Sequence, residues 1–199
     1  MITAQIVREL RAKTGAGMMD CKKALQETDG DTERAVEILR KKGLNVLSAR
    51  DQKVTEEGFI GSYNHGGRIG VIVEVNCETD FVAKNEEFRK FANDVALHIA
   101  AANPMAVSGD DLDLEFVNKE IALWDCQLRE EGKPEQIIPK IIEGKLAKLK
   151  TEVCLMHQPY VKDTDKTISD LLNELVAKFG EKIVIRRFQR FGVGENIGT

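Results

Sequence analysis

The apolar residues of this chain change their spacing once, and that change limits the folds available to it. Before residue 50, apolar side chains recur every three or four residues, which is typical of amphipathic helices. Further along, Ile69, Val71, Val73 and Val75 alternate with other residues, a period typical of a strand with one buried face. An all-helical bundle is therefore excluded, and we predict an α+β fold with an antiparallel sheet.

The first fifty residues are predicted to form three short helices. Thr3 can cap the first helix, and Asp31 can cap the third. The Gly15 and Gly17 pair separates the first two helices, and Gly43 is predicted to end the third. Residues 1–47 carry 9 basic and 7 acidic side chains, whereas the remaining residues carry 20 and 26. We therefore predict a three-helix domain at 1–50, a linker at 51–57 and an α+β core at 58–199.

Within the predicted core, the Gly66-Gly67 pair joins two strands as a β-hairpin. Helices are expected through residues 88–99, through 116–128 and after Pro134, where Pro139 should kink or delay the helix. Thr167 with Asp170 forms an N-terminal capping signature before a further helix. A last strand is predicted over residues 182–187.

Composition and charge exclude several classes of protein. Lys and Arg total 29 against 33 Asp and Glu, a net charge of −4 that disfavours direct nucleic-acid binding. The four cysteines include no C-x-x-C pair, so they are expected to be reduced and mostly buried. No apolar run is long enough to span a bilayer, and no signal sequence is recognisable at the amino terminus. We expect a cytoplasmic protein without membrane contact.

The sequence also lacks the motifs of common enzyme chemistry. It has no phosphate-binding loop, no nucleophile elbow and no dinucleotide fingerprint. Of the histidines, His98 is expected to be packed without a chemical role, whereas His65 at the hairpin turn is a candidate for binding. We therefore predict no catalytic residue, no metal ligand and no cofactor.

Two segments leave alternatives open. At residues 14–23, glycines flank two methionines, which suits either a contact surface or a bundle core with a glycine hinge. At residues 79–82, Asp80 and Phe81 follow the second strand, where they could bind a partner or simply cap and pack a helix.

Four motifs occur along the chain: TGAGMMDCKKAL at 14–25, CETDFVAKN at 77–85, QPYVKD at 158–163 and IRRFQRFGVGE at 185–195. By these motifs and their order, the chain resembles the elongation factor Ts family over essentially its whole length. The resemblance implies a ubiquitin-associated-like (UBA-like) three-helix domain, a flexible connection and an α+β core. It implies guanine nucleotide exchange on elongation factor Tu, without bond-making chemistry.

The resemblance also implies roles for both segments. Thr79, Asp80, Phe81 and Val82 would enter the GTPase near its magnesium site, where Phe81 separates helices and Asp80 competes for polar contacts. The amino-terminal helices would dock on the same G domain through a set of residues in the first motif: Thr14, Gly15, Gly17, Met18, Met19, Lys22 and Lys23.

The position of one further motif points to the short form of this family. The HGGRIGV run at residues 65–71 lies just before the exchange segment, in a single core. Two chains of the short form are expected to assemble a homodimer, in which one copy presents Asp80 and Phe81 and the other presents His65 to the partner. Trp124, Leu128 and the apolar helices after Pro134 are candidates for the dimer surface. The alternative function is a UBA-like adaptor or chaperone-like module that binds without exchange, and an enzyme with an unrecognised site is a third.

The chain departs from the family pattern at two places. Tyr160 stands where Phe is usual, and Pro139 interrupts a helix. Neither lies in the exchange segment, so these departures concern local packing.

Overall fold

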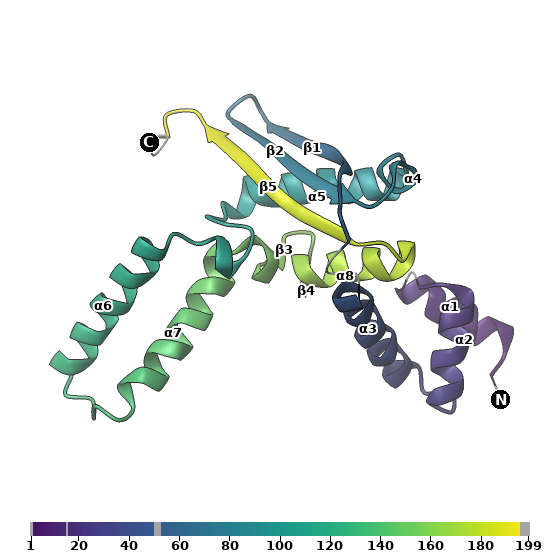
Figure 1. Ribbon diagram of the computed structural model, residues 1–199, viewed down its shortest axis with the longest axis horizontal. Helices are drawn as coiled ribbons and strands as arrows, with labels where there is room; N and C mark the ends of the chain where they lie inside the picture. Colours follow the sequence, from purple (N-terminus) through teal and green to yellow (C-terminus); the bar gives the residue numbers. More distant parts are fainter. Residues whose placement is uncertain (1, 15, 50–52, 196–199) are drawn as a thin grey trace.

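The amino-terminal quarter of the chain forms a bundle of three helices. The computed structural model describes residues 2–14, 16–49 and 53–195 of the chain. Helices α1 (Ala4–Thr14), α2 (Met18–Glu27) and α3 (Thr32–Ala49) pack together (Figure 1). Asp31 caps α3, because its Oδ1 accepts from the amides of Glu33 and Arg34 at 3.0 and 3.1 Å. The helices share their own apolar cluster of Val7, Leu10, Ala16, Cys21, Ala24, Leu25, Ala35 and Leu39.

Helix α3 is longer than predicted. It passes through Gly43 and ends at Ala49, so the prediction that Gly43 stops the helix is wrong. A single glycine costs a helix only about 1 kcal/mol, and α3 gains packing against α8 (Ile168–Phe179). The boundaries at residues 50 and 58 stay a prediction; residues 51 and 52 of the predicted linker lie outside the described part, and Glu57 already belongs to the first strand.

The core is built on a three-stranded antiparallel sheet in the order β1-β2-β5. Strands β1 (Glu57–His65) and β2 (Ile69–Cys77) form the predicted hairpin. Gly66 and Gly67 have φ angles of 58° and 71°, in the left-handed region that glycine adopts readily. The amide of Arg68 donates to the carbonyl oxygen of His65 at 3.0 Å and closes the turn. The α+β prediction is confirmed.

Strand β5 (Ile183–Gly192) is also longer than predicted. It continues five residues past Arg187, because its pairing with β2 runs from Cys77↔Ile183 to Ile69↔Gly192. The register shifts between Glu74 and Val75, which indicates a bulge. The length of the strand is therefore determined by its partner.

One face of the sheet is covered and the other is open. Helix α5 (Glu86–Ala102) packs across β1 and β2 and buries the predicted residues Phe88, Phe91, Ala92, Val95 and Ile99 (Figure 1). Val71, Val73 and Val75 point into the same core. On the opposite face, Ile60 and Ile72 are 55% and 51% exposed. The sheet therefore has a partly apolar face that no element of the described chain covers.

Helices α6 (Leu114–Glu130) and α7 (Ile138–Val153) form an antiparallel arm that projects from the core (Figure 1). Pro139 lies in the first turn of α7, so it delays the helix, and Ile137 stays outside it. Leu128 is buried in the arm, so the prediction that it belongs to the dimer surface is wrong. The short helices η1 (Gly109–Asp111) and η2 (Leu155–His157) lie on either side of the arm in the chain.

A small second sheet, which the sequence did not predict, joins the arm to the last helix. It pairs β3 (Pro159–Tyr160) with β4 (Asp163–Thr167). Thr167 and Asp170 then form the predicted capping box of α8, with bonds of 2.9 to 3.1 Å between their backbone and side-chain atoms. Helix α8 therefore contacts the bundle through α3 and leads into β5.

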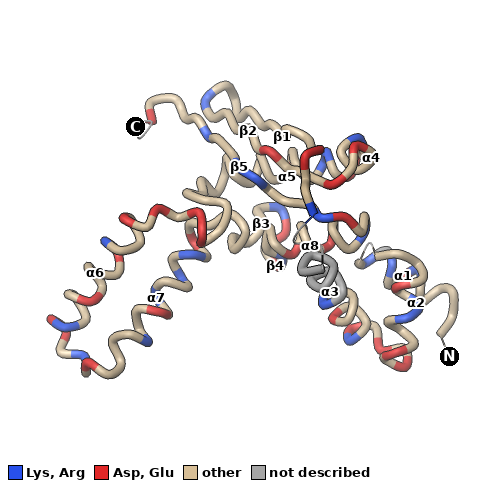
Figure 2. Tube along the Cα trace, in the orientation of Figure 1, with Lys and Arg blue, Asp and Glu red and all other residues tan. Residues whose placement is uncertain are grey.

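Figure 2 shows Lys and Arg interspersed with Asp and Glu over most of the described chain. No helix of the described residues is both long and apolar enough to cross a membrane.

Candidate partner-binding site

The strand-to-helix turn after β2 presents a large apolar side chain to solvent. Helix α4 (Asp80–Ala83) begins three residues beyond the end of β2. Phe81 is 82% exposed, whereas Val82 and Ala83 are buried in the main core. The alternative that Phe81 merely packs is therefore wrong. Val82 packs into the core and so holds the turn in place, whereas the Phe81 side chain on the same turn is exposed to solvent.

Asp80 places an ionised group beside Phe81. Its Oδ2 accepts from Lys84 Nζ at 2.6 Å. This hydrogen bond is the main cause that holds the pKa of Asp80 below its ordinary value, and the charge of Lys84 adds to it. The alternative that Asp80 caps α4 is wrong, because Thr79 occupies the N-cap position.

The turn is fastened to the loop that precedes β5. Glu181 accepts from the Thr79 hydroxyl at 2.7 Å and from the Thr79 amide at 3.1 Å. In the other direction, Glu78 Oε1 accepts from the amide of Lys182 at 2.7 Å. Cys77 Sγ donates to the Thr79 carbonyl oxygen at 3.2 Å, and burial raises the pKa of this thiol to about 11. The thiol therefore stays protonated near neutral pH.

Neither Glu78 nor Glu181 was predicted from the sequence to belong to this site. Glu181 lies 102 positions after Thr79, and a carboxylate before a strand is unremarkable in a chain that is 31% charged. The one signal was that both residues border predicted strands, whose pairing brings their ends together.

The first motif divides between the interior and the surface of the bundle. Ala16, Cys21, Ala24 and Leu25 are buried in the bundle cluster. Met18, Met19, Lys22 and Lys23 are exposed, and Gly17 is the N-cap of α2. Thr14 is half-buried and donates its hydroxyl to the Leu10 carbonyl oxygen at 2.8 Å, whereas Gly15 lies outside the described residues. The buried side chains thus fit the bundle-core interpretation, whereas a contact surface formed by the exposed side chains stays a prediction.

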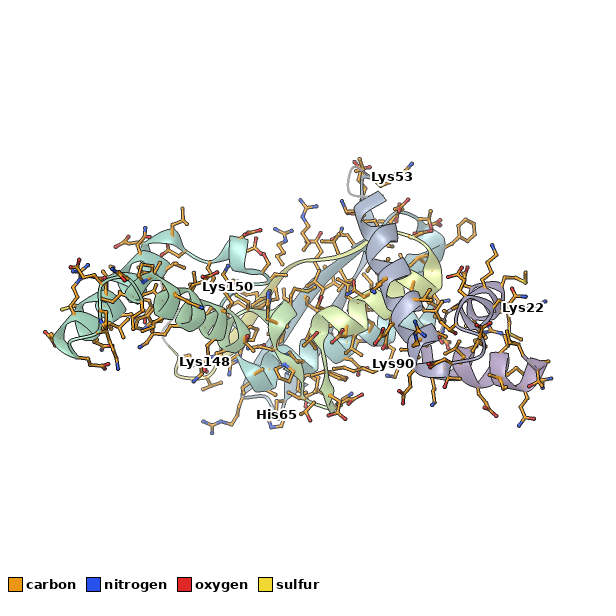
Figure 3. The ribbon with its side chains drawn as sticks, turned by 90° about the horizontal axis from the view of Figure 1, so that it is seen from below. Lys22, Lys53, His65, Lys90, Lys148 and Lys150 are labelled. Atoms are coloured by element: carbon orange, nitrogen blue, oxygen red, sulfur yellow. The ribbon has the colours of Figure 1, made fainter. Side chains whose placement is uncertain are left out.

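His65 is exposed at the hairpin turn, and Lys22 lies on the bundle, well apart from it (Figure 3). The His65 Nδ1 and the Tyr63 hydroxyl are 3.1 Å apart, and the two rings stack. Both residues line a hollow of about 340 Å³ together with Ile69, Leu97, Ala100 and Ala101. His65 and Thr79 lie at opposite ends of β2, a separation of roughly 27 Å for a nine-residue strand. One chain therefore does not bring His65 and Phe81 together.

The prediction that His98 is a packed residue is confirmed. Its Nε2 lies 3.0 Å from the Gln158 side-chain oxygen, and its Nδ1 accepts from the amide of Val161 at 3.3 Å. Gln158 in turn donates to the Glu152 carbonyl oxygen at 2.7 Å. This pattern requires a neutral imidazole with its proton on Nε2, and burial lowers the pKa of His98.

Neither a metal cluster nor a cysteine pair is found in the described part of the chain. No group of three or more His, Cys, Asp or Glu side chains there could hold a metal ion. All four cysteines are free; Cys21, Cys77 and Cys154 are buried, and Cys126 is exposed.

The bundle, the sheet core and the fixed turn define an α+β protein that exposes one large aromatic side chain on a turn held to its core. A family model described as "Elongation factor TS" matches residues 2–195. The chain is 57% identical to Elongation factor Ts of Alkaliphilus oremlandii over 196 residues, covering 98% of this chain and 91% of the relative. For the Elongation factor Ts of Desulfotalea psychrophila, the identity is 57% over 193 residues, and the coverage is 97% and 98%. The chain belongs to the elongation factor Ts family.

Proposed function

We propose that this chain binds elongation factor Tu with GDP bound and promotes GDP release, so that GTP can bind. The observation that carries this proposal is Phe81, which is 82% exposed on a turn fastened at both of its ends. Phe81 would enter between helices of the GTPase, and Asp80 would compete for the polar contacts that orient the GTPase's magnesium ion. Without that ion, the phosphate charges of GDP would be poorly neutralised.

The energetics of this proposal are attainable. Burying one phenylalanine side chain contributes about 2 kcal/mol, and a 10³-fold weakening of GDP requires about 4 kcal/mol of coupling. The disrupted charge contacts around the magnesium ion would supply the remainder. Since linkage is reciprocal, a chain that weakens GDP must itself be weakened by GDP to the same degree. The chain would therefore bind the nucleotide-free GTPase most tightly. Such exchange needs no bond-making residue and no cofactor of its own.

The bundle would supply affinity on the same G domain. Met18 and Met19 offer an adaptable apolar surface, and Lys22 and Lys23 place positive charges beside it. The buried residues of the motif hold these side chains in place, as Thr14 does through its bond to α1. This UBA-like role involves neither nucleic acid nor a membrane, and we place it in the cytoplasm, where translation elongation occurs.

We further propose that two chains pair through the open face of the sheet. Ile60 and Ile72 are exposed at the centre of that face, beside the ion pair between Glu74 and Arg187 at 2.7 Å. A second copy would cover these side chains. His65 lies just before the start of β2, and Phe81 lies just after its end. Because the two residues of one chain are this far apart, a second copy could contribute His65 to the same partner contact to which the first copy contributes Phe81.

The test is the dissociation rate of a fluorescent GDP analogue from elongation factor Tu at fixed magnesium. We expect the wild-type chain to accelerate dissociation, and we expect Phe81→Ala to reduce that acceleration at least tenfold without changing the melting temperature. Leu123→Ala, which truncates an exposed leucine on the arm, is the control. Binding without acceleration would favour the adaptor or chaperone-like alternative instead.

A further inference from the structure

The hydrogen bonds of Thr79 are unusual for a residue at the start of a helix. Thr79 is the N-cap of α4, where a threonine side chain commonly accepts from an amide in the first turn. No such cap bond is present. The Thr79 hydroxyl donates instead to Glu181 Oε1 at 2.7 Å, and the Thr79 amide donates to Glu181 Oε2 at 3.1 Å. One carboxylate therefore takes both donors of this residue.

This contact ties together two segments that are far apart in the chain. Glu181 follows Gly180, which ends α8 with a φ of 67°. Its neighbour Lys182 donates its amide to Glu78 Oε1 at 2.7 Å. The two contacts thus run in opposite directions between residues 78–79 and 181–182. A pair of crossed contacts limits rotation of the turn more than one contact would.

We infer that Glu181 is a positioning residue for nucleotide exchange. It fixes the direction in which the turn leaves the sheet, and thereby the place at which Phe81 and Asp80 meet the GTPase. Without the carboxylate, the Thr79 hydroxyl becomes able to cap α4 locally, as threonine does at other helix starts. The turn then samples several directions, and fewer encounters place Phe81 correctly. This inference rests on the proposed function.

The contact has the geometry needed for such a role. Both bonds are charge-assisted and go to the two oxygens of one carboxylate, which restricts the orientation as well as the distance. Thr79 and Glu181 are both partly buried, so water competes less for the bonds than it would at an exposed pair. Phe81 itself makes no core contact that could hold its direction, since it is 82% exposed.

The test uses three single variants of the full chain with elongation factor Tu and the fluorescent GDP analogue. Glu181→Gln keeps the size of the side chain but leaves only one acceptor, and Thr79→Val removes the hydroxyl alone. Glu174→Gln is the matched control, because Glu174 also uses both carboxylate oxygens, at 2.7 and 3.0 Å from Lys166 Nζ, but contacts nothing in the turn.

We expect Glu181→Gln and Thr79→Val each to lower the maximal rate of GDP release at saturating concentration of the chain about tenfold. Glu174→Gln should stay within twofold of wild type. The double variant Glu181→Gln with Thr79→Val should lose little more than either single variant, because both remove the same contact. A Glu181→Gln chain that matches wild type in maximal rate would overturn the inference.

A second measurement separates this inference from the proposed function. Amide hydrogen exchange at residues 79–84 in the free chain should become at least tenfold faster in Glu181→Gln, with the core amides of β2 unchanged. If wild type fails to accelerate GDP release, the proposed function fails, while this readout still decides whether Glu181 holds the turn. Unchanged exchange at residues 79–84 would overturn the positioning role, and faster exchange throughout β2 would show that Glu181 supports the whole fold instead.

Discussion

At the scale of single residues, the structure assigns opposite roles to side chains that are neighbours in the sequence. Phe81 is exposed and Val82 is buried, although both are apolar residues of one four-residue helix. The sequence predicted the segment but not this division, since a helix of one turn is too short to show a periodic pattern. No partner within the chain was predicted for Thr79, and its partner in the structure, Glu181, lies 102 positions away. Such pairings follow from the register of β2 against β5, which a single sequence does not reveal.

His98 provides a prediction for pH dependence. Its pKa is depressed in the folded chain because the imidazole is buried, and the pattern of its hydrogen bonds requires the neutral form. Between the depressed pKa of His98 in the folded chain and its ordinary pKa in the unfolded chain, the unfolded chain therefore binds more protons than the folded chain. The contribution of the neutral His98 to the free energy of unfolding is fully present above its ordinary pKa of about 6.5. This contribution is lost as the pH falls from there toward the depressed pKa of the folded chain. Each unit of pKa depression corresponds to about 1.4 kcal/mol.

The free energy of unfolding, measured in urea at several pH values between 5 and 8, tests this expectation. Wild type should lose stability from pH 7 to pH 5, and His98→Gln should show a flatter profile from a lower starting value. Tyr160, whose ring packs against His98, has a raised pKa and stays neutral throughout this range. Asp94 has a pKa below its ordinary value, so it titrates below this range. A wild-type profile as flat as that of the variant would contradict the neutral, buried His98.

At the scale of elements, the sequence predicted which helices and main strands exist better than where they end. The alternation at β2 and the buried face of α5 were both predicted, because their periods follow directly from packing against one core. The ends of α3 and β5 were predicted too early, since contact with α8 and pairing with β2 extend them. The β3-β4 sheet was missed because strands of two and five residues show almost no pattern.

The close contact of β1 with α5 predicts that Gly61 cannot be replaced. A Cβ atom at Gly61 would lie 2.4 Å from the Ala92 carbonyl oxygen, well inside van der Waals contact. We expect Gly61→Ala to lower the free energy of unfolding by about 2 kcal/mol or more, as strand and helix are forced apart. Gly144→Ala on α7 is the matched control, because nothing lies within 4 Å of its Cβ position. That variant should be neutral or up to about 1 kcal/mol more stable.

Urea unfolding of the two glycine variants and wild type, followed by circular dichroism, measures both differences. Equal stability of Gly61→Ala and wild type would show that the separation between β1 and α5 adjusts freely.

At the scale of the whole molecule, the features proposed for partner binding lie at separate places. Phe81 and His65 flank opposite ends of the sheet, and the bundle is attached through α8. The change of hydrophobic period predicted helices followed by a sheet, but it did not predict the packing of the bundle against α8, since that depends on contacts between distant segments. A partner that binds one chain would therefore have to reach three separate places, unless a second copy supplies one of them.

The proposed pairing of two chains through the open sheet face can be tested with two leucine-sized residues of equal exposure. Ile72 on that face and Leu123 on the arm are each 51% exposed. If the sheet face is the interface, Ile72→Lys places a charge where a second copy would cover it, and burial of an unpaired charge is costly. The wild-type mass in solution should then be twice the 22.2 kDa of one chain, and Ile72→Lys should shift it to one chain at micromolar concentration. Leu123→Lys should leave the pair intact, because it lies on the arm. Sedimentation equilibrium measures all three masses. A wild-type monomer would exclude the pairing, whereas a dimer that only Leu123→Lys disrupts would place the interface on the arm.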